Sequence, residues 1–107
     1  TKMVRTVETS EEFHNALKAN KRVIVKFFGD WCGPCKQILP EYEALEQAHP
    51  EVVFLKVNIG ELLDIAELAQ VLSTPTFQTF LDGQVVERIR GANLGQLTSA
   101  VENVAAA

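Results

Sequence analysis

The segment "RVIVKFF" at residues 22–28 constrains the fold more strongly than any other part of this 107-residue sequence. It is β-branched, aromatic and almost continuously apolar, which is typical of a strand that is covered on both faces. The segment "VVFLKVN" at residues 52–58 has the same character. Strands of this kind need helices on each side of their sheet, so the sequence favours a parallel core of the α/β class.

Apolar residues recur at helical spacing in four stretches. The first begins near Thr9 and Glu12, the second covers residues 33–48, the third covers residues 61–72, and the fourth begins at Leu94. Thr9 and Glu12 have the spacing of a capping box, which predicts the start of the first of these helices. Pro40 lies inside the second helix and is expected to bend it. The closing "AAA" is expected to fray from the last helix.

Asp82-Gly83 is the strongest hairpin signal in the chain, and it separates "TFQTFL" at 76–81 from "QVVERIR" at 84–90. A shorter strand candidate, "MVRTV", occupies residues 3–7. The order of strands and helices then implies right-handed crossovers and an antiparallel edge. We expect one α/β domain over residues 1–107, built as a three-layer α/β/α sandwich.

The charge balance argues against several classes of partner. The formal net charge is −4, and the nearest thing to a basic cluster is Lys18, Lys21 and Arg22, so nucleic acid is not an expected partner. No apolar run approaches the roughly 20 residues of a membrane span. The opening "TKMVRTVETS" lacks the apolar core of a signal peptide. With only two cysteines, too few for a secreted disulfide scaffold, we expect a cytoplasmic location.

Both cysteines, Cys32 and Cys35, lie in "DWCGPCK". A disulfide between them closes so short a loop that it stabilises the fold little, so the pair calls for a chemical explanation. Cys32 falls where a strand ends and a helix begins, and the positive helix end favours its thiolate. Pro34 suits the first turn of a helix, and Gly33 leaves the sulfur unshielded. Trp31 offers a flat apolar surface on which peptides can dock.

The spacing of the two cysteines predicts redox chemistry by thiol–disulfide exchange. Two intervening residues bring the sulfur atoms within bonding distance on the first turn of a helix. Cys32 is expected to attack the disulfide of a partner, and Cys35, one turn further in, is expected to resolve the mixed disulfide. No bound cofactor is needed, since the two sulfurs hold the electrons.

Two plainer readings of the cysteine pair remain. A zinc site needs further ligands, and His14 and His49 lack the short spacing that zinc sites use, so no metal is expected. Both histidines are better explained as surface residues. A purely structural pair of cysteines is the other reading, although burying two thiols requires neither Gly-Pro nor Trp31.

The motif "DWCGPCK" resembles the active site of the thioredoxin family. The segments "VIVKFF", "FLKVNI", "STPTF", "FLDGQVV" and "GAN" resemble further family segments in the same order, so the resemblance covers nearly the whole chain. It implies a five-stranded mixed sheet with four helices. It also implies a monomeric protein-disulfide reductase, an electron carrier that acts on disulfide-containing proteins and is recharged by a thioredoxin reductase.

The resemblance also implies a substrate groove beside the cysteines. Pro75 would follow a cis peptide bond and face the cysteine pair, although the sequence itself shows only an X-Pro bond, which is usually trans. The backbone of Thr74 would pair with a bound peptide, and Gly91 and Ala92 would complete the groove beside Trp31. Without the resemblance, Pro75 reads simply as a break between a helix and a strand.

Lys26 departs from the family pattern, in which a buried aspartate usually lies below the active site. Strand alternation places Lys26 on the same face as Ile24 and Phe28, and the family fold would point it toward Cys35. A charged Lys26 would hold Cys35 as thiolate and weaken the protein as a reductant, whereas a partly neutral one would accept its proton. Alternatively, the ammonium reaches water along an apolar stem. Repulsion from Lys56 on the next strand favours that route for one of the two lysines.

Milder departures concern residues around the motif. Gly29-Asp30 replaces a more usual alanine and variable residue, and Asp30 is expected to be solvated. The segment at residues 58–61 replaces an acidic pattern and is expected to affect only local turn geometry. Thr74 stands where isoleucine or methionine is commoner, so the groove is expected to be more polar.

Two rival functions remain open at this stage. Oxidases and isomerases of the same fold generally carry histidine between the cysteines, where Pro34 stands here. A non-enzymatic binding module within a larger assembly is the other rival. Both cysteines and Trp31 argue against a mere scaffold without excluding one.

Overall fold

The computed structural model describes residues 4–107, and these form five strands and four helices. In chain order they are β1 (Arg5–Val7), α1 (Ser10–Ala19), β2 (Arg22–Phe28), α2 (Gly33–Ala48), β3 (Val53–Asn58), α3 (Leu63–Leu68), β4 (Thr76–Leu81), β5 (Gln84–Arg90) and α4 (Leu94–Ala106). The predicted first strand included Met3, which lies outside the described residues.

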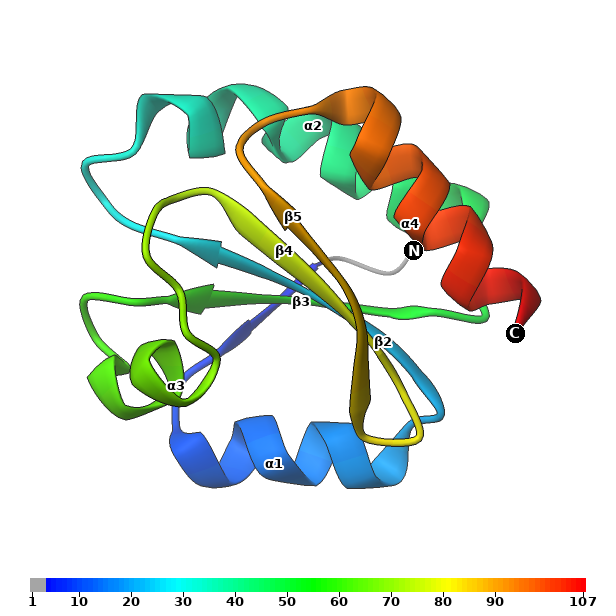
Figure 1. Ribbon diagram of the computed structural model, residues 1–107, viewed down its shortest axis with the longest axis horizontal. Helices are drawn as coiled ribbons and strands as arrows, with labels where there is room; N and C mark the ends of the chain where they lie inside the picture. The colour runs from blue at the N-terminus through cyan, green and yellow to red at the C-terminus, as the bar shows by residue number, and fades with distance from the viewer. Residues whose placement is uncertain (1–3) are drawn as a thin grey trace.

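The strands form one mixed sheet in the order β1-β3-β2-β4-β5 (Figure 1). β1, β3 and β2 run parallel to one another. β4 pairs antiparallel with β2, and β5 pairs antiparallel with β4. Helices α1 and α3 cover one face, whereas α2 and α4 cover the other. The predicted three-layer arrangement with a five-stranded sheet and four helices is therefore confirmed.

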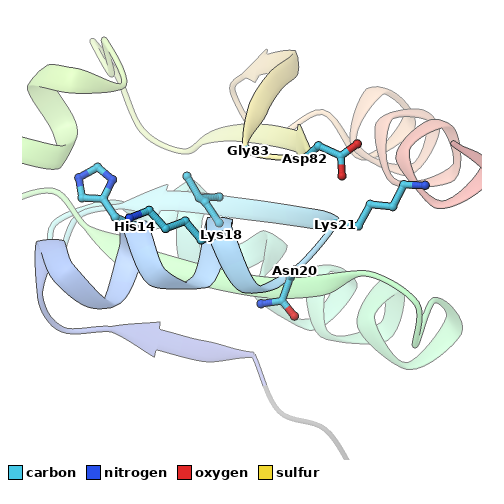
Figure 2. A pocket seen from close by; sticks show the side chains of 7 residues that line it. His14, Lys18, Asn20, Lys21, Asp82 and Gly83 are labelled. Carbon is cyan, nitrogen blue, oxygen red and sulfur yellow. The ribbon is translucent and has the colours of Figure 1, made fainter.

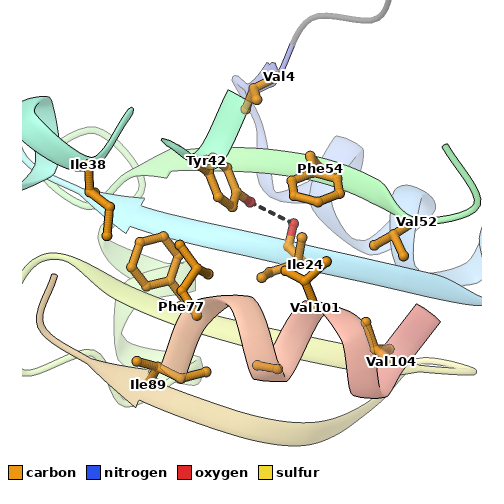
Figure 3. Close-up of a cluster of buried hydrophobic side chains, with 12 residues drawn as sticks. Val4, Ile24, Ile38, Tyr42, Val52, Phe54, Phe77, Ile89, Val101 and Val104 are labelled. Atoms are coloured by element: carbon orange, nitrogen blue, oxygen red, sulfur yellow. Dashed lines mark hydrogen bonds between the residues drawn. The ribbon is translucent and has the colours of Figure 1, made fainter. Parts of the chain in front are cut away.

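The alternation of β2 divides its side chains between two apolar cores. Ile24 packs into the core beneath α2 and α4, shown in Figure 3, together with Tyr42 and Phe77. Val23, Val25 and Phe27 pack into the core beneath α1 and α3. With both faces filled, β2 is held at the centre of the sheet, and the residues that follow its end are fixed in position.

Tyr42 links α2 to the sheet from within the first core. Its hydroxyl lies 3.1 Å from the carbonyl oxygen of Ile24 and 2.8 Å from that of Leu55, on two neighbouring strands. It therefore shares its one proton between β2 and β3. Complete burial raises the pKa of Tyr42 well above its usual value, which keeps the phenol protonated and able to donate.

Several predicted boundaries match the structure because local chemistry marks them. Thr9 caps α1, and its hydroxyl accepts a hydrogen bond from the backbone N–H of Glu12 over 3.1 Å. Asp82 and Gly83 have φ values of 51° and 82°, the left-handed pair that a two-residue hairpin turn requires. The predicted bounds of β2 and α2 are also confirmed.

The prediction of a helix over residues 61–72 was too long. α3 spans only Leu63–Leu68, without a side-chain cap at Leu62. Gln70 has a φ of 58°, and this left-handed backbone ends the helical path. Leu72, which lies beyond the end of α3, is 85% exposed.

The expectation of a frayed C-terminus was also wrong. α4 remains helical to Ala106. The guanidinium of Arg22 donates hydrogen bonds to the carbonyl oxygen of Ala107, with one Nε···O distance of 3.1 Å. A terminal carbonyl is thereby anchored to the start of β2, a contact between residues too far apart for a sequence pattern to reveal.

We predict that Tyr42→Phe destabilises the protein by about 1–2 kcal/mol, because a buried hydroxyl and its strand acceptors lose their hydrogen bond while the ring packing is kept. Urea unfolding measures the change. Gln47→Ala, on the exposed face of the same helix, serves as control and is expected to stay within about 0.5 kcal/mol of wild type. Equal stability of Tyr42→Phe and wild type would contradict the claim that the hydroxyl of Tyr42 stabilises the contact between α2 and the sheet.

Candidate active site

The two cysteines meet at the start of α2. Cys32 and Cys35 are joined by a disulfide, with their Cα atoms 5.3 Å apart. Gly33 and Pro34 form the first helical positions between them. The two sulfurs are bonded to each other, as their spacing predicted.

Cys32 is the N-cap residue of α2. Its φ and ψ are −89° and 101°, and its sulfur accepts a hydrogen bond from the backbone N–H of Cys35 over 3.1 Å. A backbone donor and the positive end of a 16-residue helix thus converge on one sulfur. Both environments favour a negative charge on Cys32 when the disulfide is open.

The side chain of Trp31 packs over two glycines, Gly29 and Gly60. The indole is 70% exposed. A Cβ atom added to Gly29 would lie 2.6 Å from the ring, and one added to Gly60 would lie 3.5 Å from it. Gly29 therefore permits the ring to pack against the backbone of the loop before Cys32, a role that the sequence pattern did not reveal.

Asn58 is a second residue that sequence reasoning missed. It is only 6% exposed at the end of β3. Its Nδ2 donates to the carboxylate of Asp30 over 3.0 Å, and its Oδ1 accepts from the N–H of Gly60 over 2.9 Å. The segment at residues 58–61 therefore does more than shape its own turn, because it braces the loop before Cys32. The sequence signal that could have indicated this role is an Asn at the end of a buried strand, two residues before a Gly.

The Thr74–Pro75 peptide bond is cis, as the family resemblance implied. The carbonyl of Pro75 accepts a hydrogen bond from the N–H of Gly91 over 2.8 Å. Two of the predicted groove residues are thus joined directly. Pro75 is buried, Thr74 is half-buried and Ala92 is exposed.

Lys26 points inward, toward the helix that carries the disulfide. Its side chain is 3% exposed, and its Nζ donates to the carbonyl oxygen of Cys35 over 2.6 Å. The snorkelling alternative is therefore wrong. Burial and, to a lesser extent, the positive charge of Lys56 lower the pKa of Lys26 from 10.5 to about 8, although the negative charge of Glu43 acts in the opposite direction.

A separate hollow of about 400 Å³ lies between α1 and the turn after β4 (Figure 2). Lys18, Lys21 and Asp82 line it, and the N–H of Asp82 donates to the carbonyl of Lys21 over 2.8 Å. Lys21 immediately precedes β2, whereas Cys32 follows its other end. This hollow is therefore remote from the disulfide and is not part of the candidate site.

Residues 4–103 match the family model described as Thioredoxin. The chain belongs to the thioredoxin family. It is 38% identical over 104 residues to Thioredoxin 1 of Plasmodium falciparum, a match that covers 97% of this chain and all of that protein. Its chemistry is accordingly dithiol–disulfide exchange at Cys32 and Cys35, with the activity of a protein-disulfide reductase.

Two other thioredoxins extend the comparison. The mitochondrial Thioredoxin-3 of Saccharomyces cerevisiae is 39% identical over 93 residues, which cover 87% of this chain and 73% of that protein. A solved structure of Plasmodium falciparum thioredoxin superposes with a TM-score of 0.91 at 37% identity, covering 94% of this chain and 98% of that one. Within residues 4–107, none of the helices has the length and apolar character needed to cross a bilayer.

We predict that Gly29→Ala displaces the indole of Trp31, because the new Cβ would lie 2.6 Å from the ring. Trp31 is the only tryptophan, so its fluorescence reports the movement directly. The emission is expected to shift and its quenching by the neighbouring disulfide to change. Gly33→Ala is the matched control, since a Cβ there meets nothing within 4 Å and should leave the spectrum unaltered. Identical spectra for both variants would contradict the close packing of Trp31 against Gly29.

We predict that Lys26→Met stabilises the oxidised protein below pH 8, by on the order of 1 kcal/mol, because it removes an incompletely compensated buried charge. The pKa of Lys26 is lowered from 10.5 to about 8 on folding, so between these values the unfolded chain binds more protons. The destabilisation of the folded protein by the charge of Lys26 is therefore complete below pH 8, and it disappears as the pH rises toward 10.5.

Urea unfolding of oxidised wild type and Lys26→Met at both ends of this pH range measures the change. The difference in stability between the two proteins should narrow with rising pH. A difference that is constant over the whole range would show that the charge of Lys26 carries no cost.

Proposed function

We propose that Cys32 is the nucleophile of this reductase and that Cys35 is its resolving thiol. The observation that carries the assignment is the position of the Cys32 sulfur at the N-cap of α2, 3.1 Å from a backbone N–H donor. Cys35 lies one turn into the helix and is 2% exposed, against 5% for Cys32. A sulfur stabilised as thiolate at the helix tip is suited to attack, and the more enclosed sulfur is suited to the intramolecular step.

The exchange then runs in two balanced steps. The thiolate of Cys32 attacks one sulfur of a target disulfide, that bond breaks, and the other target sulfur leaves as a thiolate. The thiolate of Cys35 next attacks the sulfur of Cys32, and the mixed disulfide releases the second target thiolate. The target gains two electrons, and the protein is left with the Cys32–Cys35 disulfide that the structure contains.

We assign substrate docking to Trp31, Thr74, Pro75, Gly91 and Ala92. The exposed indole supplies an apolar surface next to Cys32. The hydrogen bond between Gly91 and Pro75 supports a continuous backbone surface on the other side of the groove. An extended target segment would pair with the backbone of Thr74 and place its disulfide over Cys32.

The partners we propose are disulfide-containing proteins and a thioredoxin reductase that returns two electrons to the Cys32–Cys35 disulfide. The protein would act as a monomer, since the chemistry needs only the two cysteines of one chain. We propose a cytoplasmic location on the basis of cysteine usage. One relative, Thioredoxin-3 of Saccharomyces cerevisiae, is mitochondrial, so sequence similarity alone does not select the compartment.

We predict that the reduced protein catalyses insulin reduction with dithiothreitol as electron donor, and that Cys32→Ser abolishes the catalysis because no nucleophile remains. Turbidity of the released insulin chains measures the rate. The Lys18→Met variant, changed on α1 at the remote hollow, should retain the wild-type activity. Activity that survives in Cys32→Ser would overturn the assignment of the nucleophile.

Cys35→Ser separates the two roles. Cys32 can still attack, but nothing resolves the product, so a mixed disulfide between Cys32 and the target should accumulate and be visible by mass spectrometry. A binding module without redox activity would instead show no turnover and would keep its partner in the Cys32→Ser variant.

A further inference from the structure

The ammonium of Lys26 adjoins the more deeply buried cysteine of the redox pair. The side chain of Lys26 is 3% exposed and that of Cys35 is 2% exposed. The hydrogen bond from Nζ to the carbonyl oxygen of Cys35 is 2.6 Å long, so the charge is held at the residue that bears the sulfur. An ammonium has three N–H donors, and this bond uses one of them.

A cavity of about 100 Å³ borders this contact. Lys26, Asp30, Cys35, Lys36 and Lys56 line it together with apolar side chains. Its volume is well above the roughly 10–15 Å³ that a single water molecule needs. Lys26 and Cys35 therefore line one space, in which the flexible end of Lys26 has room to move.

The surroundings of Lys26 are predominantly basic or neutral. Lys56 stands in register with it on β3, and the uncharged Phe77 stands in register on β4. The titratable side chains around Lys26 are Asp30, Lys36, Tyr42, Glu43 and Lys56. The carboxylate of Asp30 is engaged by Asn58, and burial keeps Tyr42 protonated. The buried ammonium is thus only partly compensated while the disulfide is closed.

We propose that Lys26 is a positioning residue of the redox centre: its ammonium stabilises the thiolate that reduction creates on Cys35. The proposal rests on the dithiol exchange described above. It adds a residue that determines how readily the disulfide accepts electrons.

Reduction places a negative charge on Cys35, the residue whose carbonyl oxygen the ammonium already contacts. A thiolate of the reductant attacks the sulfur of Cys32, the Cys32–Cys35 bond breaks, and its electron pair leaves on Cys35 as a thiolate. A second thiolate of the reductant then displaces Cys32, and the reductant becomes a disulfide. Lys26 supplies the opposite charge beside Cys35 that the oxidised protein lacks.

The consequence is a shift of the redox equilibrium toward the reduced form. An opposite charge within about 4–6 Å lowers the pKa of an acidic group by about 1–3 units. The desolvation cost of Lys26, which is only partly compensated in the oxidised protein, is also offset by the thiolate after reduction. Both effects stabilise the reduced protein, so Lys26 makes this thioredoxin a weaker reductant and keeps Cys35 ionised for the resolving attack.

The first test is the redox equilibrium against glutathione at mildly alkaline pH for wild type, Lys26→Met and Lys26→Arg. Lys26→Met should lower the ratio of reduced to oxidised protein at least about tenfold, a potential more negative by about 30 mV for two electrons. Lys26→Arg should restore much of the wild-type ratio. Lys18→Met, a lysine-to-methionine change on α1 at the remote hollow, is the matched control and should leave the ratio unchanged.

The second test titrates Cys35 alone, in the Cys32→Ser background, by the ultraviolet absorbance of its thiolate. The apparent pKa of Cys35 should be at least about one unit lower with Lys26 present than in the Lys26→Met variant. A purely structural lysine would change stability without moving this titration. Coincident titrations together with equal redox ratios would overturn the proposal.

The outcomes separate this proposal from the proposed function. If wild type reduces insulin but Lys26→Met has the wild-type redox ratio and Cys35 titration, the role of Lys26 is wrong and the function stands. If wild type fails to turn over insulin while the Cys35 titrations differ, the function is wrong and the electrostatic role of Lys26 stands.

Discussion

The redox chemistry of this protein depends on how the end of β2 passes into α2. β2 is fixed because its side chains fill a core on each face of the sheet, and α2 begins only a few residues later. The turn between them leaves Cys32 as the N-cap, where its sulfur takes the place that an oxygen usually has in capping a helix. The backbone N–H of Cys35, which donates to this sulfur, would also stabilise a thiolate on Cys32.

Two charge effects of different origin therefore act on the two sulfurs. Cys32 lies at the helix tip, where backbone dipoles favour negative charge without any side chain. Cys35 lies inside, where burial opposes ionisation and only a neighbouring charge such as that of Lys26 can offset the cost. On this account the backbone stabilises a negative charge on Cys32, and a side chain stabilises one on Cys35.

Much of this organisation is predictable from sequence, because its determinants are local. The strand at residues 22–28, the helix that begins at Gly33 and the turn at Asp82-Gly83 each carry their own chemical signal. The early end of α3 depends on the left-handed backbone of Gln70, which no residue preference announces. The roles of Gly29 and Asn58 depend on contacts with Trp31 and Asp30 that form only when distant loops meet. Strand alternation placed Lys26 on the same face as Ile24, and only the family resemblance pointed it toward Cys35; its hydrogen bond to Cys35 required the placement of α2.

The rate of alkylation of each cysteine in the reduced protein, measured against pH and assigned by mass spectrometry, tests the central claim most directly. If the N-cap position activates Cys32, this residue reacts first, and its rate follows a pKa clearly below the usual value of about 8.5 for a free thiol. A Cys32 that titrates at or above that value, or that reacts more slowly than Cys35, would contradict the account.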